Sequence, residues 1–377
     1  MRRLVLLAAA LLIGGTFLSA KPVNDDDALL SGIYVLMEPE TRTVLEEKDC
    51  HKRCNAGYLS KLMALLLIAE DIDSGRLSLT EELTASETVY GTKGAVVWLS
   101  PGDNMTVDEL IKSAAVGNAN DAITVLAEHS AGSIEEFTAR MNAAAFDLGL
   151  RDTAFFSPYG YYDEREHTTA YDMAVICSEL LEHETVMPYF SIWRDHVKSG
   201  QTELVNENTL SRTYDLHCGF KACHSDEAGY CIAECGKNDK GEKYIAVVLG
   251  SPDQDTSFHT AKTLIRSGFS GYRMTASAFP EDALRPVSVR NGEAAAVELG
   301  LAENSDLVVP KGESRLRIVT VLPEYLEAPL SAGQLVGKAA FFNGKELVFE
   351  TDVIVKNDVN KLTFRFILEK IMYKTIN

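Results

Sequence analysis

Apolar residues recur at helical spacing through the first half of the chain. Residues 59–73 are the strongest case, because Leu62, Leu66 and Ala69 fall on one face and Gly75 follows the segment. This pattern predicts a buried central helix. Three further helices are predicted at 107–115, 121–131 and 134–148.

Short strand-like runs replace the helical pattern elsewhere. Residues 33–38 and 43–48 flank the turn at Pro39, and three later runs are separated by polar, turn-rich segments. These later strands are predicted at 218–223, 230–235 and 244–249. Helices followed by a mainly antiparallel sheet indicate an α/β (α+β) domain, which we place at residues 28–275.

The chain changes character after a proline-containing connection at 276–286. Residues 286–355 hold only short strand-like runs, such as 316–322 and 347–355, interrupted by glycines. We therefore expect a separate, small all-β domain at 286–357. No internal repeat is found.

Both ends of the chain carry distinct signals. Arg2 and Arg3 precede an apolar stretch, and small residues follow at Ser19 and Ala20, as in a secretory signal peptide over residues 1–20. The protein is therefore expected to be secreted into the cell envelope. The last residues, 361–377, return to helical spacing.

That tail has an apolar face and a charged face, and its local charge is positive. Lys361, Arg365 and Glu369 lie apart from an apolar set made up of Leu362, Phe366, Ile367, Ile371 and Met372. Such a helix suits an anionic membrane surface, where the protein would be a peripheral membrane protein. It equally suits packing against the β domain, so both interpretations stay open.

Charge narrows the choice of partners. The chain has 36 basic and 55 acidic residues, a formal charge of −19. Without Arg2 and Arg3 the mature chain would have 34 basic and 55 acidic residues, a formal charge of −21. Nucleic acid is therefore an unfavourable partner, since phosphate binding requires clustered Lys and Arg.

Seven cysteines in an exported chain favour disulfides. If 225–228 is a turn, Cys218 faces Cys235 across the ladder and Cys223 lies within disulfide reach of Cys231. Two other cysteines, Cys50 and Cys54, would pair with each other or with this hairpin. The alternative is a zinc site that uses these thiols with His217 or His224. We favour disulfides, and expect no metal and no cofactor.

Three segments, in this order, carry the chemistry. The first is Tyr58-Leu59-Ser60-Lys61 at the start of the central helix, and the second is Asn118-Ala119-Asn120. The third is Lys221-Ala222-Cys223, followed by Asp226 to Tyr230. Together with the signal peptide, the β domain and the tail, they resemble the Ser-x-x-Lys, Ser-x-Asn and Lys-Thr-Gly elements of D-alanyl-D-alanine carboxypeptidases, the low-molecular-mass penicillin-binding proteins.

The resemblance implies a serine peptidase site, but this sequence departs from it at the reacting groups. Tyr58 stands at the nucleophile position, and the chain contains no Ser-x-x-Lys. A phenol oxygen stands several ångströms beyond a serine oxygen, whereas such sites require placement within about 0.5 Å. Ser60, next to Lys61, should point away from it on a helix.

The other two elements are altered as well. Asn118 replaces a serine hydroxyl, Ala222 lacks a hydroxyl, and the Cys223 side chain replaces glycine at the strand edge. Asn120 is retained and is expected to bind a peptide carbonyl, and Lys221 is expected to anchor a substrate carboxylate. A second Lys-Ser-Gly at 198–200 lacks the downstream context and is interpreted as a surface turn.

These departures favour a pseudoenzyme of the cell envelope that binds peptidoglycan stem peptides or another envelope protein. The second hypothesis is an active D-alanyl-D-alanine carboxypeptidase in which Tyr58 is acylated and Lys61 acts as base. The third is a redox or metal-binding module built on the cysteines. Against all three stands a purely structural role, in which carboxylates satisfy Lys61 and Lys221.

Overall fold

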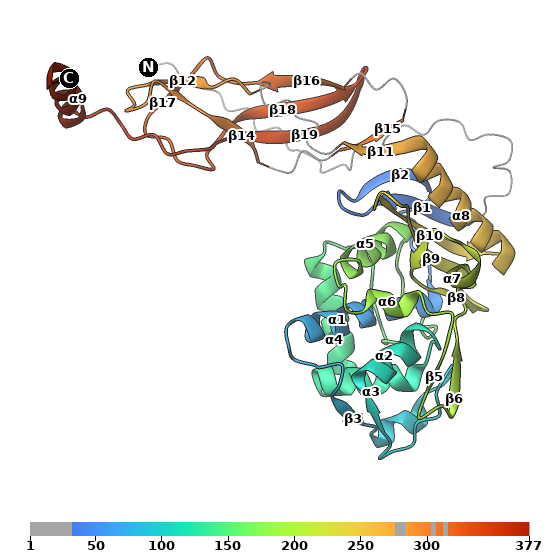
Figure 1. Ribbon diagram of the computed structural model, residues 1–377. Coiled ribbons are helices and arrows are strands. Elements are labelled where there is room, and N and C mark those ends of the chain that lie inside the picture. Colours follow the sequence, from blue (N-terminus) through green and yellow to red (C-terminus); the bar gives the residue numbers. More distant parts are fainter. Residues whose placement is uncertain (1–31, 276–283, 303–306, 312–315, 377) are drawn as a thin grey trace. The chain divides into compact units, whose positions relative to one another are not determined.

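The computed structural model describes residues 32–275, 284–302, 307–311 and 316–376. The predicted signal peptide lies outside this part of the chain. The described residues up to Tyr272 form one compact unit, and those from Arg273 onward form another. The course of the chain through both is shown in Figure 1.

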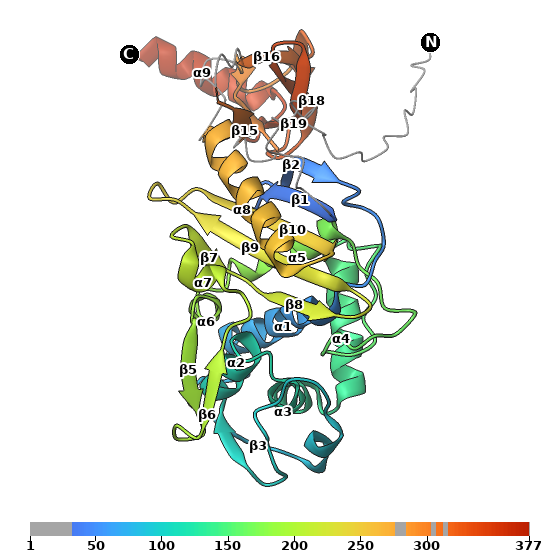
Figure 2. The same ribbon diagram turned by 90° about the vertical axis from the view of Figure 1, so that its right-hand side faces the viewer.

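The first unit is built on an antiparallel sheet with strand order β2, β1, β10, β9, β7, in which β8 also pairs with β9. Helix α8 lies along one face and α5 with α1 along the other, as Figures 1 and 2 both show. Gly236 lets α8 approach closely, because a Cβ there would lie 2.3 Å from Ile265. The strands are β1 (Ile33–Glu38), β2 (Thr43–Lys48), β7 (His217–Gly219), β8 (Ala222–Ser225), β9 (Gly229–Lys237) and β10 (Lys243–Ser251).

Helix α1 (Lys61–Asp73) is the centre of the helical half of this unit. Nearly all of its residues are buried, and the neighbouring helices enclose it. This arrangement confirms the predicted central helix. The other helices are α2 (Val107–Ala115), α3 (Asn120–Ala131), α4 (Ile134–Asp147), α5 (Ala170–Leu180), α6 (Met187–Phe190), α7 (Leu210–Thr213) and α8 (Gln254–Gly271).

Short elements complete the first unit. A 3-10 turn, η2 (Gly57–Ser60), leads directly into α1, and a second, η3 (Glu87–Gly91), precedes α2. Two small hairpins pair β3 with β4 and β5 with β6. These strands are β3 (Glu82–Thr84), β4 (Asn104–Thr106), β5 (Arg194–Val197) and β6 (Thr202–Val205).

One predicted strand is wrong. Residues 218–223 form two short strands, because β7 ends at Gly219 and β8 begins at Ala222. Between them Phe220 and Lys221 are both buried. The pairing of this edge with β9 is irregular, because the register shifts between His217 and Gly219.

The second unit contains strands and one terminal helix. A four-stranded sheet has the order β14, β19, β18, β16, and buried Phe341 and Val353 belong to its core. This agrees with the predicted C-terminal β domain. The strands are β11 (Tyr272–Thr275), β12 (Val287–Arg290), β13 (Ala296–Val297), β14 (Leu299–Leu301), β15 (Leu307–Pro310), β16 (Leu316–Val321), β17 (Tyr325–Glu327), β18 (Leu335–Asn343) and β19 (Glu346–Val355).

Helix α9 (Phe364–Ile376) ends the chain and corresponds to the predicted tail helix. Among its described apolar side chains, Phe364 is 80% exposed and Ile371 57%, whereas Phe366 is half-buried. This exposure speaks against the interpretation that α9 packs on the β domain. In the described part of the chain, no helix combines the length and the apolar character needed to span a membrane.

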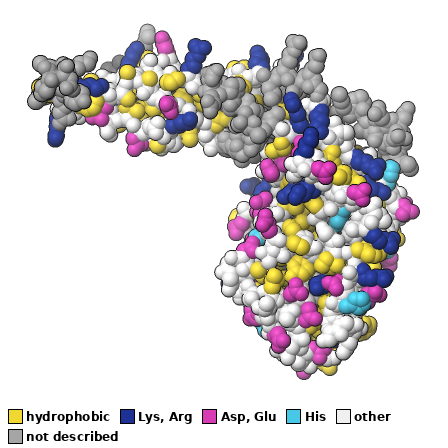
Figure 3. Space-filling model, in the orientation of Figure 1, with side chains coloured by type: hydrophobic (Ala, Val, Ile, Leu, Met, Phe, Trp, Pro, Cys, Tyr) yellow, Lys and Arg dark blue, Asp and Glu magenta, His cyan; other side chains and the backbone are white. Residues whose placement is uncertain are grey.

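Charged side chains of both signs cover the surface. On the face shown in Figure 3, acidic and basic groups of the first unit are interspersed. The ion pair between Lys112 and Asp195, 2.9 Å apart, is one of several that neutralise single lysines and arginines.

The cysteines divide into one bonded pair and five thiols. Cys218 and Cys235 form a disulfide across the sheet edge, as predicted, with their Cα atoms 5.3 Å apart. Cys223 and Cys231 are cross-strand partners but are not bonded to each other. The remaining free thiols are Cys50, Cys54 and Cys177, so the expected bonding of Cys50 and Cys54 is not found.

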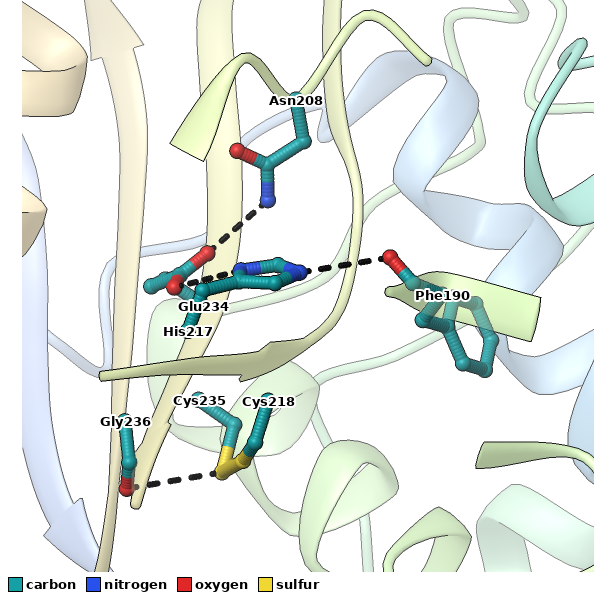
Figure 4. The surroundings of a disulfide bond; sticks show 7 residues. All are labelled: Phe190, Asn208, His217, Cys218, Glu234, Cys235 and Gly236. Carbon is teal, nitrogen blue, oxygen red and sulfur yellow. Dashed lines mark hydrogen bonds and ion pairs between the residues drawn. A yellow bond between two sulfur atoms is a disulfide. The ribbon is translucent and has the colours of Figure 1, made fainter. Parts of the chain in front are cut away.

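A buried polar cluster lies next to the disulfide (Figure 4). His217 Nδ1 and Glu234 Oε1 are 2.8 Å apart, and Asn208 Nδ2 donates to the other oxygen of Glu234 at 2.8 Å. The hydrogen bond to Glu234 raises the pKa of His217 despite its burial. Burial likewise raises the pKa of Glu234, so the pair holds a proton that it loses as the pH rises.

This cluster predicts a pH-dependent stability. The pKa of His217 in the folded protein lies above its usual value of about 6.5. Its contribution to the unfolding free energy is therefore complete below about pH 6.5 and is lost as the pH rises through the pKa of the folded state. The difference in unfolding free energy between wild type and H217Q should therefore be largest near pH 6 and shrink by pH 9, as measured by urea titration. H259Q, at an exposed position of α8, is the control. A difference that grows with pH would contradict this assignment.

Candidate functional site

Lys61 is the centre of the candidate site. It is the first residue of α1 and is completely buried. Its ammonium donates to the Tyr159 carbonyl at 3.0 Å and lies 4.4 Å from the centroid of the Tyr58 ring. The segment that supplies Tyr159 passes very close to η2, because a Cβ on Gly160 would lie 2.1 Å from the Gly57 carbonyl oxygen.

Tyr58 presents its ring, and not its hydroxyl, to Lys61. The ammonium lies over the aromatic face in a cation–π contact, which contributes about 2 kcal/mol when desolvated. The phenol oxygen lies at the far end of the ring, where a Cβ built on Gly94 would be 3.6 Å from it. The tyrosine therefore covers the amine without offering it an oxygen to deprotonate.

Burial and a second lysine control the charge of Lys61. Desolvation lowers its pKa well below the usual lysine value, and the nearby charge of Lys221 lowers it further. Glu207 and Glu166 act in the opposite direction. Among the described residues, neither lysine forms an ion pair with a carboxylate, so carboxylates do not satisfy them as the structural hypothesis required.

Ser60 points away from Lys61, as the helical geometry predicted. Its hydroxyl donates to Glu166 Oε1 at 2.9 Å, and the Phe156 amide donates to the other carboxylate oxygen at 3.2 Å. Burial raises the pKa of Glu166 to about 7. Ser60 therefore binds an internal acid and is unavailable as a substitute nucleophile.

The second element lies where α2 leads into α3. Asn118 adopts a left-handed conformation with φ of 57°, and Asn120 begins α3. Asn120 Nδ2 donates to the Lys93 carbonyl at 2.6 Å. Within the described residues, the buried Oδ1 atoms of Asn118 and Asn120 have no hydrogen-bond donor. Each is therefore a buried acceptor whose hydrogen-bonding capacity is unused in this conformation.

Lys221 binds backbone carbonyls within the protein. Its buried ammonium donates to the carbonyls of Ala114 at 2.9 Å and Ala115 at 2.7 Å, which end α2. A cation is stabilised at the C-terminal end of a helix, where carbonyls lack helical partners. Burial lowers its pKa to about 8. The sequence-based expectation of an anchor for a substrate carboxylate therefore gains no support from the geometry.

Cys223 fills the contact between β8 and η2. Its thiol donates to the Ala56 carbonyl at 3.6 Å, and a Cβ on Gly57 would lie 3.8 Å from the sulfur. Ala222 and Cys223 also line a pocket of about 390 Å³ along the edge strand. The lining includes neither Tyr58 nor Lys61; its other members are Asn206, Glu207, Thr209, His224, Tyr230, Cys231, Gln254, Ser257 and Phe258.

The similar Lys-Ser-Gly at 198–200 lies in the turn between β5 and β6, as expected for a surface turn. Lys198 donates to the Trp98 carbonyl at 2.9 Å and pairs with Asp103 at 3.3 Å. It therefore fixes the loop before α2 and takes no part in the arrangement around Lys61.

The zinc hypothesis is wrong in its stated form. Cys218 and Cys235 are consumed by the disulfide, and His217 is engaged by Glu234. In the part of the chain that the structure describes, no group of three or more His, Cys, Asp or Glu side chains is placed to hold a metal ion.

Several residues that shape the site were missed by the sequence reasoning. Tyr159 supplies a carbonyl, which is a backbone group that no side-chain pattern marks. Glu166 is one acid among 55 acidic residues, and its hydrogen bond from Ser60 is visible only in the fold. Glu207 acts at long range on both lysines.

Comparisons with known proteins agree on one family. A family model described as D-alanyl-D-alanine carboxypeptidase matches residues 20–253, and one described as the C-terminal domain of penicillin-binding protein 5 matches residues 274–361. The chain is 30% identical over 344 residues to D-alanyl-D-alanine carboxypeptidase DacF of Bacillus subtilis, covering 90% of this chain and 88% of that protein.

A second relative and a solved structure extend the comparison. DacC of Escherichia coli is 27% identical over 357 residues, covering 92% of this chain and 88% of DacC. The structure of penicillin binding protein 5 from Haemophilus influenzae superposes with a TM-score of 0.82 at 24% identity, covering 88% of this chain and 98% of that one. This structural likeness supports the fold.

The contact between Tyr58 and Lys61 predicts the effect of two substitutions. Y58F keeps the ring over the ammonium and should change the unfolding free energy by less than about 0.5 kcal/mol. Y58A removes the ring from the buried Lys61 ammonium and leaves a gap beside η2. It should therefore lower the unfolding free energy by about 1–3 kcal/mol, which is less than the loss expected for a fully buried aromatic residue. Urea denaturation measures both.

Y90A is the matched control, because Tyr90 is 72% exposed and its loss should be nearly neutral. Equal losses in Y58F and Y58A would show that the hydroxyl, and not the ring, makes the stabilising contact.

Proposed function

The chain belongs to the D-alanyl-D-alanine carboxypeptidase family, and from this premise we propose that it binds peptidoglycan stem peptides without cleaving them. The observation that carries the proposal is the Tyr58 ring against the Lys61 ammonium; among the described residues, no hydroxyl is hydrogen-bonded to this base. The family processes peptidoglycan, so the proposed ligand keeps the family's substrate class.

Loss of cleavage follows from the chemistry of acyl transfer. A lysine base activates a nucleophile only when it can take that group's proton at hydrogen-bonding distance. Lys61 instead contacts a carbonyl and an aromatic face. In a serine protease, removal of the nucleophile costs on the order of a million-fold in turnover. The substitutions Asn118, Ala222 and Cys223 add to this loss.

Retention of binding is supported by the acceptors beside the site. The Oδ1 atoms of Asn118 and Asn120 are buried and lack donors among the described residues. A stem peptide offers backbone N–H groups of the kind these atoms require. An active carboxypeptidase would need a nucleophile beside Lys61, and no described contact favours one.

The envelope location is supported by the predicted signal peptide and by the family. We further propose that α9 rests on an anionic membrane surface. The exposed apolar residues Phe364, Leu368 and Ile371 are spaced four and three residues apart, which places them on one side of the helix. Basic residues flank them at Lys361, Arg365 and Lys370, and such charges are attracted to anionic lipid headgroups.

A fluorescent penicillin tests the loss of acylation. The wild-type protein should show no covalent label, because no hydroxyl lies beside Lys61. Y58S alone should label weakly, since the other two elements remain altered. The combined variant carrying Tyr58→Ser, Asn118→Ser, Ala222→Thr and Cys223→Gly should label much faster, as measured by gel fluorescence after denaturation.

Lys61→Ala in the combined variant is the control and should abolish labelling, since the serine would lose its base. Stoichiometric label on the wild-type protein would contradict the proposed loss of chemistry, wherever the label maps.

Vesicle sedimentation tests the membrane proposal. The wild-type chain should sediment with vesicles of phosphatidylserine and phosphatidylcholine and remain in the supernatant with phosphatidylcholine alone. The double variant F364S/L368S should lose most of this binding, because it removes apolar area that the membrane would bury. Burial of such area contributes about 25 cal/mol per Å² to the binding free energy. V321S, at an exposed position of β16, is the control. Equal binding by all three proteins would contradict the role of α9.

A further inference from the structure

We propose that Cys223 and Cys231 form an oxidisable dithiol beside the site, closing to a disulfide that changes how η2 is held. The two residues are register partners on β8 and β9. Partners in an antiparallel ladder have their Cβ atoms about 4.5–5.5 Å apart on the same face, which small adjustments bring to disulfide distance.

The same sheet edge already carries such a bond. Cys218 and Cys235 are joined across β7 and β9 with Cα atoms 5.3 Å apart. The neighbouring pair therefore lies in a ladder whose strand separation accommodates a disulfide. The Cys223 thiol also lies close enough to Cys231 to raise the pKa of the Cys231 thiol, to which burial contributes as well.

The pair is connected to the candidate site through its hydrogen bonds. The Cys223 thiol donates to the Ala56 carbonyl at 3.6 Å, at the residue that precedes η2. The Cys231 thiol donates to the Ala228 carbonyl at 3.5 Å. A disulfide has no S–H, so oxidation removes both donors. The attachment of η2, and with it Tyr58, then depends on the redox state of this pair.

The reaction balances with an external disulfide as the oxidant, such as oxidised glutathione or the disulfide of an exported oxidoreductase. One cysteine thiolate attacks a sulfur of that disulfide and releases one thiol. The second cysteine then displaces the other thiol and forms the Cys223–Cys231 bond. In total the protein loses two protons and two electrons, and the oxidant becomes two thiols.

The accessibility and the pKa of the two thiols determine how fast the Cys223–Cys231 disulfide should form. Cys223 is 4% exposed and Cys231 is 1% exposed, so attack requires local opening of the edge strand. Because the thiolate is the attacking species and the pKa of Cys231 is raised, reaction should be slow at pH 7 and faster at pH 9.

The test uses the full mature chain, reduced mildly so that Cys218–Cys235 stays intact, and then treated with oxidised glutathione. Remaining thiols are alkylated after unfolding, and the chain is cleaved after Tyr230, which separates Cys223 from Cys231. We expect a linked pair of peptides with a mass lower by two hydrogen atoms. C223S should instead stop at a glutathione adduct on Cys231 or remain unreacted.

C177S is the matched control, because Cys177 is buried in α5 and should leave the Cys223–Cys231 bond unchanged. Recovery of both thiols in alkylated form from wild type, after incubation long enough for local opening, would overturn the proposal. So would a bond from Cys231 to Cys54, whose charge also acts on Cys231. The wild-type measurement stands even where C223S fails to fold.

Hydrogen exchange tests the link to η2. The Leu59 amide donates to the Ala56 carbonyl at 3.3 Å, the same oxygen that accepts from Cys223. After oxidation, exchange over residues 57–60 should become several-fold faster than in the reduced protein, since the segment leading into η2 loses its hydrogen bond from β8. Unchanged exchange in a protein shown to carry the bond would contradict the structural consequence.

Discussion

A buried ammonium held under an aromatic ring organises this site. Lys61 is enclosed where α1 begins, and two groups satisfy it: the Tyr159 carbonyl and the face of Tyr58. A buried amine is costly unless it is hydrogen-bonded, and these two contacts reduce that cost. The same ring occupies the space in which a short alcohol would meet the base. One contact therefore helps to hold the start of α1 and, under the proposed function, takes the place of a nucleophile beside the base.

The surrounding architecture is preserved although the reacting groups have changed. The sheet edge, η2 and the start of α3 still meet around Lys61, and the second lysine lies close enough to lower its pKa. Lys221 is satisfied by carbonyls at the end of α2, and Cys223 closes the contact to η2. In this structure Lys221 and Cys223 thus make hydrogen bonds within the protein.

Much of the fold followed from the sequence. The periodicity at 107–115 predicted α2 to the residue, and the apolar run at 59–73 predicted α1, because helices that bury one face or all faces leave a strong pattern. Helix α8 and the break between β7 and β8 were missed. The first has a diffuse apolar pattern, and the second accompanies a register shift against β9, which is decided by how the strands pair and not by their own sequence. The positions of Tyr58, Asn120 and Lys221 were read from motifs, but their partners were not, because backbone carbonyls leave no trace in a sequence.

The most direct test is to measure binding and turnover on one ligand. A stem pentapeptide ending in D-alanyl-D-alanine is titrated into the mature chain by calorimetry, and free D-alanine is assayed in the same samples. Saturable binding without release of D-alanine is the predicted result. Release that disappears in Lys61→Ala would show a working base and nucleophile, and would contradict the account.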